Sequence, residues 1–539
     1  MKKAMKKLMA ALLAVAMVCA MAIPAWADDG GTTTASTTNT LTIHGSTTGR
    51  AYEAYQVFKG KLNSSGVLSD IQWGDGVDGE AIRIDGNLPT SLQGAKTPAE
   101  LAAKLENTTV TAADVDTFAK VVGDHLTSVN HTSVAVSGTN YTISGLSDGY
   151  YFIKDATINL PEGATYSRYM LSILKDETIY TKDTSVKLDK EIYHNDTDSW
   201  GVVGDNQIGD TVEFRTITTV PDVTGYTSYT YEIHDTMSSE LTSNVKAYSD
   251  ITIKVGDALN SAVLNPSYYT VTANGNTFTV FVDIIAATND NVIKAGDSLY
   301  TYYSGVLNET AKVCPDGPQQ NKAYLVYSNN PSTSGTGKTP EKTVYDWTFK
   351  VDVTKVDGTD HSKTLKGAVF ALTGTSNVTL NPDANGEPAE SDKTKLIKLI
   401  ANADGSYTVA PKDYTGVVTY TMTTPDNGQI SIKGLDDNTE YYLHETKAPD
   451  GYNSLTAPVK IKITDNTYEA TGNYISHQPN VVFNGSNAYS GVGFEVENNR
   501  GTTLPGTGGI GTTIFYVIGG GLMVAAAILL ITKKRMENR

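Results

Sequence analysis

Short segments in which apolar and polar residues alternate recur along the chain from residue 41 to residue 496. This period of two residues is that of a β-strand with one buried face. The segments are rich in Thr, Val and Tyr and are separated by Gly and Asn, which favour turns. The pattern therefore predicts a mainly β protein in which several β-sandwich domains follow one another and form a rod. The expected strands include Leu41–His44, Ala51–Phe58, Tyr141–Ile143, Tyr150–Ile153, Tyr169–Leu174, Thr211–Thr219, Tyr229–His234, Thr270–Val282, Tyr324–Tyr327, Phe349–Val356, Gly367–Leu372, Gln429–Ile432, Tyr441–His444 and Phe494–Val496.

Two short helices interrupt the β pattern near the N-terminus. Thr97 and Glu100 form a capping box around Pro98, which is favourable in a first helical turn. Thr111 is placed to cap a second helix over residues 112–126, whose apolar residues recur with helical spacing. The expected domains are an N-terminal one over residues 28–183, a middle β-sandwich over 184–342 that ends in a linker at 331–342, and a C-terminal one over 343–503.

Both ends of the chain carry apolar segments of a different kind. Four lysines precede the apolar stretch Leu8–Ile23, and Ala25-Trp26-Ala27 offers a cleavage site, so residues 1–27 are predicted to be a signal peptide. Residues 504–539 include the apolar run Ile514–Ile531, which is about long enough to cross a bilayer. The basic cluster Lys533–Arg535 behind this run marks the cytoplasmic side.

The net charge argues against nucleic-acid binding, and the cysteine content excludes an internal disulfide bond. The formal net charge of −17 becomes more negative when the signal peptide is removed, and such a surface repels nucleic acid. Cys19 lies in the signal peptide, which leaves Cys314 alone, so an intramolecular disulfide is impossible. An exported protein without disulfides needs another chemistry if its domains are covalently reinforced.

No motif for a cofactor, a metal or an enzyme emerges from the sequence. Residues 506–511 spell a dinucleotide fingerprint, but no strand precedes them and no βαβ unit follows. The eight histidines show no metal-ligand spacing. The Asp/Asn run Asn381–Asp392 is interpreted as a solvated loop, with weak calcium binding as the alternative. We therefore expect no enzyme activity, cofactor or metal.

The segment Leu504–Gly508 reads Leu-Pro-Gly-Thr-Gly and directly precedes the apolar run. This order of motif, span and basic tail resembles the cell-wall sorting signal of Gram-positive surface proteins, whose LPxTG motif is cut by a sortase. The resemblance implies recognition of Leu504 and Pro505, cleavage between Thr507 and Gly508, and transfer of the Thr507 carbonyl to an amine. It also implies a secreted, wall-anchored protein whose precursor is only transiently in the plasma membrane.

Lysine and asparagine occupy apolar strand faces at the two ends of the third domain. Lys355 shares the face of Val353, and Asn498 shares that of Val496, which is costly unless the polar groups meet a partner. Between them, Tyr441–Tyr452 resembles the E-box of sortase-assembled pilins and their collagen-adhesin type B domains. Such domains are Ig-like β-sandwiches that join Lys to Asn through a self-formed isopeptide bond, helped by a buried acid.

The resemblance implies a bond between Lys355 and Asn498, with Glu445 as the promoting acid. Asn499 is the alternative to Asn498, but alternation places it on the opposite face of the strand. Burial lowers the pKa of a lysine amine, so a neutral nucleophile becomes available. Folding holds the reactants together and replaces an external catalyst. Ammonia leaves, and the first and last strands of the domain become linked.

The second domain repeats this logic with a different acid. Tyr231–Met237 resembles the segment of pilin middle domains that supplies an aspartate, and Asn321–Pro331 resembles their closing strand. The resemblance implies Lys190 as nucleophile, Asp235 as acid and Asn329 as acyl donor, with Asn330 open as an alternative to Asn329. In the first domain, Lys154 stands where the E-box acid would be, and Leu41–His44 lacks a lysine, so we expect no internal bond there.

Between the first and second domains, Thr178–Asp183 resembles the pilin motif, in which a lysine accepts the sortase-bound threonine of the next subunit. The resemblance implies Lys182 as the acceptor, although Thr181 replaces the usual proline; Lys187 and Lys175 are rivals. A head-to-tail bond of this kind repeats along one axis and builds a filament.

The implied function is that of a structural backbone subunit of a covalently polymerised surface pilus. The implied partners are identical subunits, a pilus-specific sortase, a housekeeping sortase with peptidoglycan at the base, tip or minor pilins, and a host surface ligand. The alternative is a wall-anchored adhesin or minor pilin that is not polymerised.

Overall fold

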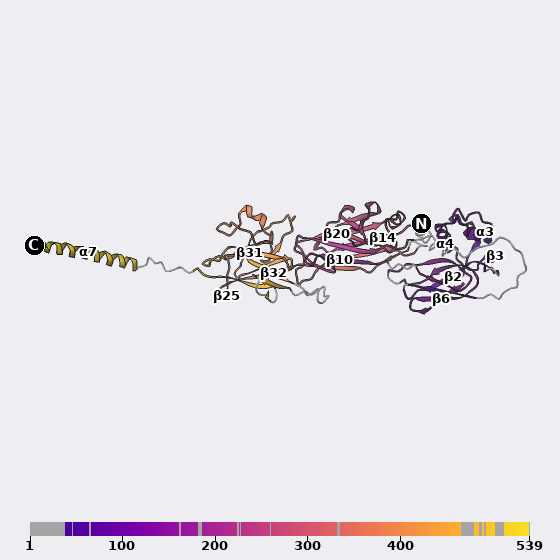
Figure 1. Ribbon diagram of the computed structural model, residues 1–539, viewed down its shortest axis with the longest axis horizontal. Coiled ribbons are helices and arrows are strands. Elements are labelled where there is room, and N and C mark those ends of the chain that lie inside the picture. The colour runs from indigo at the N-terminus through magenta and orange to yellow at the C-terminus, as the bar shows by residue number, and fades with distance from the viewer. Residues whose placement is uncertain are drawn as a thin grey trace.

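The computed structural model arranges three β-rich domains in a row along its longest axis, with the C-terminal helix α7 (Gly511–Glu537) at one end (Figure 1). The expected mainly β fold is confirmed. The structure describes residues 38–45, 47–63, 66–160, 163–181, 186–223, 226, 228–258, 260–330, 335–464, 479–484, 488–489, 492–501 and 511–537.

Among the residues that the structure describes, the first domain combines two sheets with three helices. Its elements are β1 (Asn39–His44), β2 (Tyr52–Leu62), β3 (Leu68–Trp73), α2 (Gly79–Ile84), α3 (Pro98–Leu105), α4 (Ala112–Asp124), β4 (His131–Thr132), β5 (Val134–Ser137), β6 (Asn140–Leu146), β7 (Gly149–Asp155), β8 (Arg168–Ile173) and β9 (Glu177–Tyr180). One sheet has the order β5-β6-β1-β9, and the other has the order β3-β2-β7-β8 with β4 beside β2. Thr97 and Thr111 cap α3 and α4 as the sequence predicted, whereas α2, capped by Asp78, was not foreseen.

The second domain is a β-sandwich with one short α-helix among its described residues. Its elements are β10 (Leu188–His194), β11 (Ser199–Gly201), β12 (Val203–Asp205), β13 (Thr211–Thr219), β14 (Tyr231–Met237), β15 (Leu241–Ser243), η1 (Tyr248–Asp250), β16 (Thr252–Val255), β17 (Ala262–Val263), η2 (Pro266–Tyr268), β18 (Tyr269–Asn274), β19 (Thr277–Val282), α5 (Ile284–Asn289), β20 (Ser298–Leu307), β21 (Gln319–Ser328), β22 (Thr336–Lys338) and β23 (Lys342–Trp347). The sheets have the orders β11-β10-β13-β20-β16-β17 and β12-β23-β21-β14-β19-β18, with β15 beside β20 and β22 beside β21. Because β23 pairs with β21 and β12, it belongs to this domain, and the boundary falls after β23 rather than before it.

The third domain is also built from two sheets. Its elements are β24 (Phe349–Asp357), β25 (Asp360–Thr364), β26 (Val369–Thr373), η3 (Glu390–Lys395), β27 (Leu399–Ala401), β28 (Tyr407–Val409), β29 (Met422–Thr423), β30 (Gln429–Leu435), β31 (Glu440–Lys447), β32 (Val459–Thr464), β33 (Asn480–Phe483), β34 (Ala488–Tyr489) and β35 (Gly493–Asn498). The sheets have the orders β25-β24-β30-β28-β27 and β29-β26-β31-β32-β33-β34, and β35 pairs with β24 in parallel. The first and last strands of the domain therefore lie side by side.

The second and third domains share one continuous hydrophobic core, in which Trp347 and Phe349 are buried on either side of the boundary. The backbone N–H of Ile208 donates to the carbonyl oxygen of Gly434 across the junction at 3.0 Å. Gly434 has a φ of +85°, and a Cβ there would lie 2.5 Å from Ile208 Cδ1. Only glycine combines this conformation with so close an approach, so the junction is tightly packed.

Candidate functional site

Lys355 on β24, Glu445 on β31 and Asn498 on β35 meet in the core of the third domain. The parallel pairing sets Lys355 opposite Val496, two residues before Asn498, so both polar side chains lie on the buried face. The side chains of Lys355 and Glu445 have no exposed area, and Asn498 is 2% exposed. The arrangement follows from strand parity, because the neighbours on the same faces are apolar.

The carboxyl group of Glu445 bridges the amine and the amide. Lys355 Nζ lies 3.4 Å from Glu445 Oε1, and Asn498 Nδ2 donates to Glu445 Oε2 at 3.1 Å. The Leu455 backbone N–H also donates to Oε2, at 2.8 Å, and Asn498 Nδ2 donates to the Asn453 carbonyl oxygen at 2.5 Å. The amide is thus held next to the amine, with the Glu445 carboxyl group between them.

Burial makes the amine of Lys355 a better nucleophile. It lowers the pKa of Lys355 from 10.5 to about 8, although the nearby Glu445 favours the charged form. At pH 7 this leaves roughly one amine in ten neutral, against a few in ten thousand for an unperturbed lysine. A neutral amine close to a side-chain amide is what acyl transfer between them requires.

A second buried cluster joins Lys190 on β10, Asp235 on β14 and Tyr303 on β20. Lys190 Nζ donates to Asp235 Oδ2 at 2.5 Å, and neither side chain has exposed area. The Tyr303 hydroxyl accepts a hydrogen bond from Lys190 Nζ and donates one to Asp235 Oδ2. The rings of Phe214 and Tyr303 lie 5.5 and 5.0 Å from Nζ, so the surroundings of the amine are largely apolar.

Burial shifts both ionisable partners of this cluster, Lys190 and Asp235, toward their neutral forms. Burial lowers the pKa of Lys190 and raises that of Asp235, although each group favours the charged form of the other. Burial beside Asp235 also raises the pKa of Tyr303 well above its usual value, so the hydroxyl keeps its proton. These shifts favour the neutral amine that can act as a nucleophile and the protonated carboxyl group that can act as an acid.

The predicted acyl donor of the second domain, Asn329, does not lie in this cluster. Asp235 pairs with Ala323, and Asn329 lies six residues further along the chain, or about 20 Å in a strand. The backbone carbonyl oxygen of Asn329 accepts a hydrogen bond from the backbone N–H of Tyr166, in the first domain, at 2.8 Å. Asn330 lies one residue further still, so the structure corrects both alternatives.

Asn321 takes the place that the sequence assigned to Asn329. It is 1% exposed and lies two residues from Ala323 on the same face of β21, opposite Met237. Its side chain lies close enough to Asp235 and Tyr303 to favour their ionised forms. Neither of its amide atoms completes a well-aligned hydrogen bond within the part of the chain described. A buried side-chain amide without a hydrogen bond needs a partner, and the amine of Lys190 belongs to the same cluster.

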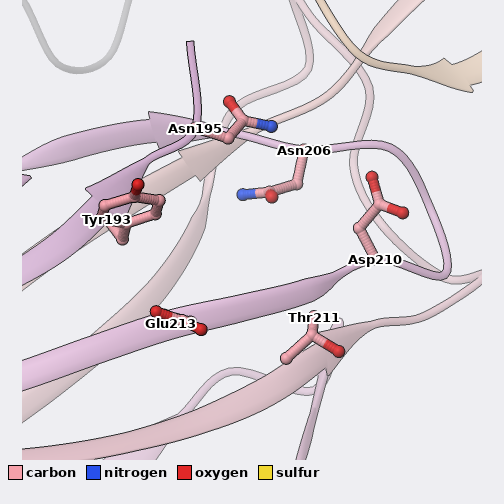
Figure 2. A pocket seen from close by; sticks show the side chains of 6 residues that line it. All are labelled: Tyr193, Asn195, Asn206, Asp210, Thr211 and Glu213. Atoms are coloured by element: carbon pink, nitrogen blue, oxygen red, sulfur yellow. The ribbon is translucent and has the colours of Figure 1, made fainter. Parts of the chain in front are cut away.

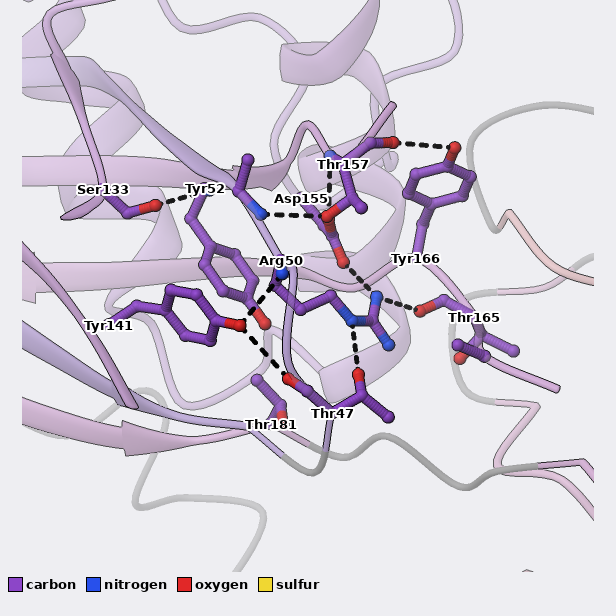
Figure 3. A network of polar contacts seen from close by, with 12 residues as sticks. Thr47, Arg50, Tyr52, Ser133, Tyr141, Asp155, Thr157, Thr165, Tyr166 and Thr181 are labelled. Atoms are coloured by element: carbon purple, nitrogen blue, oxygen red, sulfur yellow. Dashed lines mark hydrogen bonds and ion pairs between the residues drawn. The ribbon is translucent and has the colours of Figure 1, made fainter. Parts of the chain in front are cut away.

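The first domain holds a buried ion pair instead, between Arg50 and Asp155 (Figure 3). Arg50 Nη1 donates to Asp155 Oδ2 at 2.6 Å and to the Thr165 carbonyl oxygen at 2.8 Å. The Thr157 N–H donates to Asp155 Oδ1 at 3.1 Å. A guanidinium does not lose its proton, so it serves as a charge partner and not as a nucleophile. Lys154, on the adjacent position of β7, is exposed.

The predicted residues of sortase chemistry lie outside the described residues: Lys182, Leu504, Pro505, Thr507 and Gly508. The rival lysines Lys175 and Lys187 are described, and both are exposed. Within helix α7, the segment Ile514–Glu537 is long and apolar enough to cross a membrane, and its most apolar stretch of 18 residues has a mean hydropathy of 2.5.

Three participants in the clusters were missed from the sequence. Tyr303 lies in the strand Ser298–Leu307, where the alternation of residues could have predicted that its side chain is buried. Asn321 has the same strand parity as Asn329, so alternation did not separate them. Asn453 acts through its backbone carbonyl oxygen, for which the sequence carries no signal.

Comparison with known families agrees with this arrangement. Residues 349–474 match the SpaA family of prealbumin-like fold domains, and residues 496–538 match the LPXTG cell wall anchor motif. The chain is therefore a cell-wall-anchored surface protein in which a prealbumin-like domain precedes the anchor.

Individual proteins extend the likeness to the other domains. The chain is 27% identical over 269 residues to the trypsin-resistant surface T6 protein of Streptococcus pyogenes serotype M6, and the match covers 43% of this chain and 48% of that protein. The chain thus spans about half the length of the curated relative that it matches. The solved T6 backbone pilin of the same serotype, a modular three-domain structure, superposes with a TM-score of 0.52 and 16% identity over 87% of this chain and 100% of that one. The major pilin SpaD of Corynebacterium diphtheriae gives a TM-score of 0.45 and 17% identity over 86% and 98%. The chain shares the fold of the T6 backbone pilin.

Proposed function

We propose that this protein is the structural backbone subunit of a covalently polymerised cell-surface pilus. The observation that carries the proposal is the pair of buried lysine–acid–asparagine clusters, one in each of two successive sandwiches, in a chain that ends in a wall anchor motif. A subunit that transmits tension along a filament benefits from links between strands that are not hydrogen bonds alone. The T6 backbone pilin, whose fold the chain shares, supports the same function.

Each cluster is proposed to form an internal isopeptide bond, Lys190–Asn321 with Asp235 as acid and Lys355–Asn498 with Glu445 as acid. The neutral Nζ attacks the amide carbon of the asparagine, the acid protonates the departing nitrogen, and the resulting carboxylate takes up the proton that Nζ loses. A C–N bond forms between Nζ and Cγ, the Cγ–Nδ2 bond breaks, and ammonia leaves with the transferred proton. Effective molarities of about 10⁵ M or more for preorganised groups remove the need for an enzyme.

Polymerisation is proposed to join Thr507 of one subunit to Lys182 of the next. A pilus-specific sortase would cut between Thr507 and Gly508 and pass the acyl group to the lysine amine. A housekeeping sortase would attach the last subunit to peptidoglycan, and minor pilins would occupy the tip or base. The wall anchor motif over residues 496–538 supports handling by a sortase. A host surface ligand is a further expected partner.

A cell-wall extract boiled in detergent tests this function. Wild-type protein is expected to run as a ladder of covalent multimers, Lys182→Ala as a monomer, and the control Lys187→Ala as an unchanged ladder. Monomer alone from wild-type cells contradicts polymerisation and favours a wall-anchored adhesin or minor pilin. A ladder that survives Lys182→Ala but disappears with Lys187→Ala or Lys175→Ala contradicts the choice of acceptor.

A further inference from the structure

Buried aspartates gather where the second domain meets the third. Asp205 ends β12, and Asp436 and Asp437 follow β30; they are 1%, 4% and 0% exposed. The exposed Asp196, in the turn between β10 and β11, completes the group. These positions come from both sides of the domain boundary. Carboxylates rarely gather in a buried interface without a counter-charge, because each loses its hydration.

Three of these side chains converge on one point. One carboxylate oxygen each of Asp196, Asp205 and Asp437 lies within 4.8 Å of the other two. Calcium binds protein oxygens at 2.3–2.6 Å, so oxygens on opposite sides of the ion are up to about 5 Å apart. The three oxygens therefore fit around a single Ca²⁺ without movement of the backbone.

Asp205, one of the buried carboxylates, lacks a full set of hydrogen bonds. Asp205 Oδ1 has no hydrogen-bond partner among the residues that the structure describes, and Oδ2 faces His194 Nε2 at 3.1 Å. Asp436 Oδ1 is likewise without a hydrogen-bond partner in the described ranges. A buried carboxylate oxygen that accepts no hydrogen bond needs a proton or a cation beside it, and a cation also offsets the repulsion among neighbouring carboxylates.

A polar pocket of about 300 Å³ is lined in part by Asn195 and Asn206, the chain neighbours of Asp196 and Asp205 (Figure 2). Its lining residues are Tyr193, Asn195, Asn206, Asp210, Thr211 and Glu213. Asn195 Nδ2 donates to Asp436 Oδ2 at 3.1 Å, and Asn206 Nδ2 donates to Asp346 Oδ1 at 2.7 Å, so two pocket side chains contact carboxylates at the junction. The pocket provides room for the water molecules that a partly hydrated ion keeps.

We propose that Asp196, Asp205 and Asp437 bind one Ca²⁺ ion, which ties the second domain to the third. Carboxylate oxygens are hard ligands, which favour Ca²⁺ or Mg²⁺ over softer metals, and the irregular set suits the flexible geometry of Ca²⁺ better than the strict octahedron of Mg²⁺. Water from the pocket fills the remaining positions. Calcium sites of extracellular modules typically have dissociation constants of about 10⁻⁴–10⁻³ M, and an exported protein meets such concentrations. The site is independent of the isopeptide bonds and of polymerisation.

The test uses the mature protein, stripped of metal with a chelating resin. Equilibrium dialysis against CaCl₂ is expected to show saturable binding that Asp196→Asn weakens about tenfold or more. Asp196 is exposed, so this variant keeps the fold; Asp205→Asn and Asp437→Asn should abolish binding. The control Asp426→Asn, at a side chain that is 91% exposed, should bind as wild type. Ca²⁺ at 100 times the dissociation constant should raise the melting temperature of wild type but not of Asp205→Asn.

Two results would overturn the proposal. Wild-type protein that binds no Ca²⁺ up to 10 mM, about ten times the weakest expected dissociation constant, means that the carboxylates share protons instead of a metal. Binding that survives both Asp196→Asn and Asp437→Asn means that the ion sits elsewhere, for example in the Asn381–Asp392 loop. Stronger binding of Mg²⁺ than of Ca²⁺ contradicts the choice of ion.

Discussion

Replacing the reactive pair of the third domain measures how much the proposed crosslink stabilises it. In the double variant Lys355→Met/Glu445→Gln, an apolar chain of similar length replaces the buried amine. The glutamine oxygen still accepts from Asn498 Nδ2 and from the Leu455 N–H, as Glu445 Oε2 does now. No charge is left buried without a partner, so the loss of stability reports the missing bond and little else.

The magnitude follows from the loop that the bond closes. Lys355 and Asn498 are about 140 residues apart, and the chain-entropy relation for a crosslink of this span gives about 5 kcal/mol. For a unit of roughly 150 residues, 1 kcal/mol corresponds to about 2–4 °C, so the melting temperature of the third domain should fall by about 10–20 °C.

Differential scanning calorimetry of the mature protein provides the assay. A matched control is the double variant Lys366→Met/Asp426→Asn, which removes an exposed ion pair of 3.1 Å in the same domain. Exposed pairs contribute about 0–1 kcal/mol, so this control should melt within a few degrees of wild type. If the buried double variant also melts within a few degrees of wild type, the third domain is not crosslinked and the reasoning fails.

Three further predictions concern the buried polar clusters, one in each domain. In Asn321→Ala only one of the two ammonia losses can occur, so its mass should lie about 17 Da below that of its own unmodified sequence, whereas Asn329→Ala should still lie about 34 Da below. Intact mass spectrometry distinguishes the two variants, and the reverse result would restore Asn329. In Asn498→Ala the unlinked Lys355 amine, whose pKa is lowered by burial from 10.5 to about 8, resists a proton that the unfolded chain accepts. The free energy of unfolding should therefore be highest above pH 10.5 and fall by about 3 kcal/mol toward pH 8, as measured by denaturant titration; a flat profile relative to Lys355→Met would contradict a buried amine. Arg50→Met leaves a carboxylate buried without its cation and should destabilise the first domain by about 3–5 kcal/mol, read as faster proteolysis of that domain alone; unchanged proteolysis would mean that the ion pair is dispensable.

Strand parity marked Lys355 and Asn498 as buried, because their neighbours on the same strand faces are apolar. Their pairing and the role of Glu445 came from the resemblance to the E-box. The resemblance to the pilin closing strand was wrong in its choice of Asn329, and parity did not separate Asn329 from Asn321. What separates them is the register of β21 against β14, which depends on tertiary packing.

Features that join distant segments were not predictable from the pattern. β23 alternates like the opening strand of a new domain, and only its pairing with β12 and β21 assigns it to the second one. The aspartates at the domain junction come from positions 205 and 437, and neither has a local motif. Alternation identifies which face of a strand is buried, but it does not identify the strand that it meets.

The central claim is that buried lysines of this protein become acylated by asparagine side chains. Intact mass spectrometry of the mature protein, with its termini determined, tests it most directly. Two bonds predict a mass about 34 Da below that of the unmodified sequence, and digestion should yield linked peptides that pair Lys190 with Asn321 and Lys355 with Asn498. A mass equal to that of the unmodified sequence would contradict the claim and leave only a tethered row of β-sandwiches.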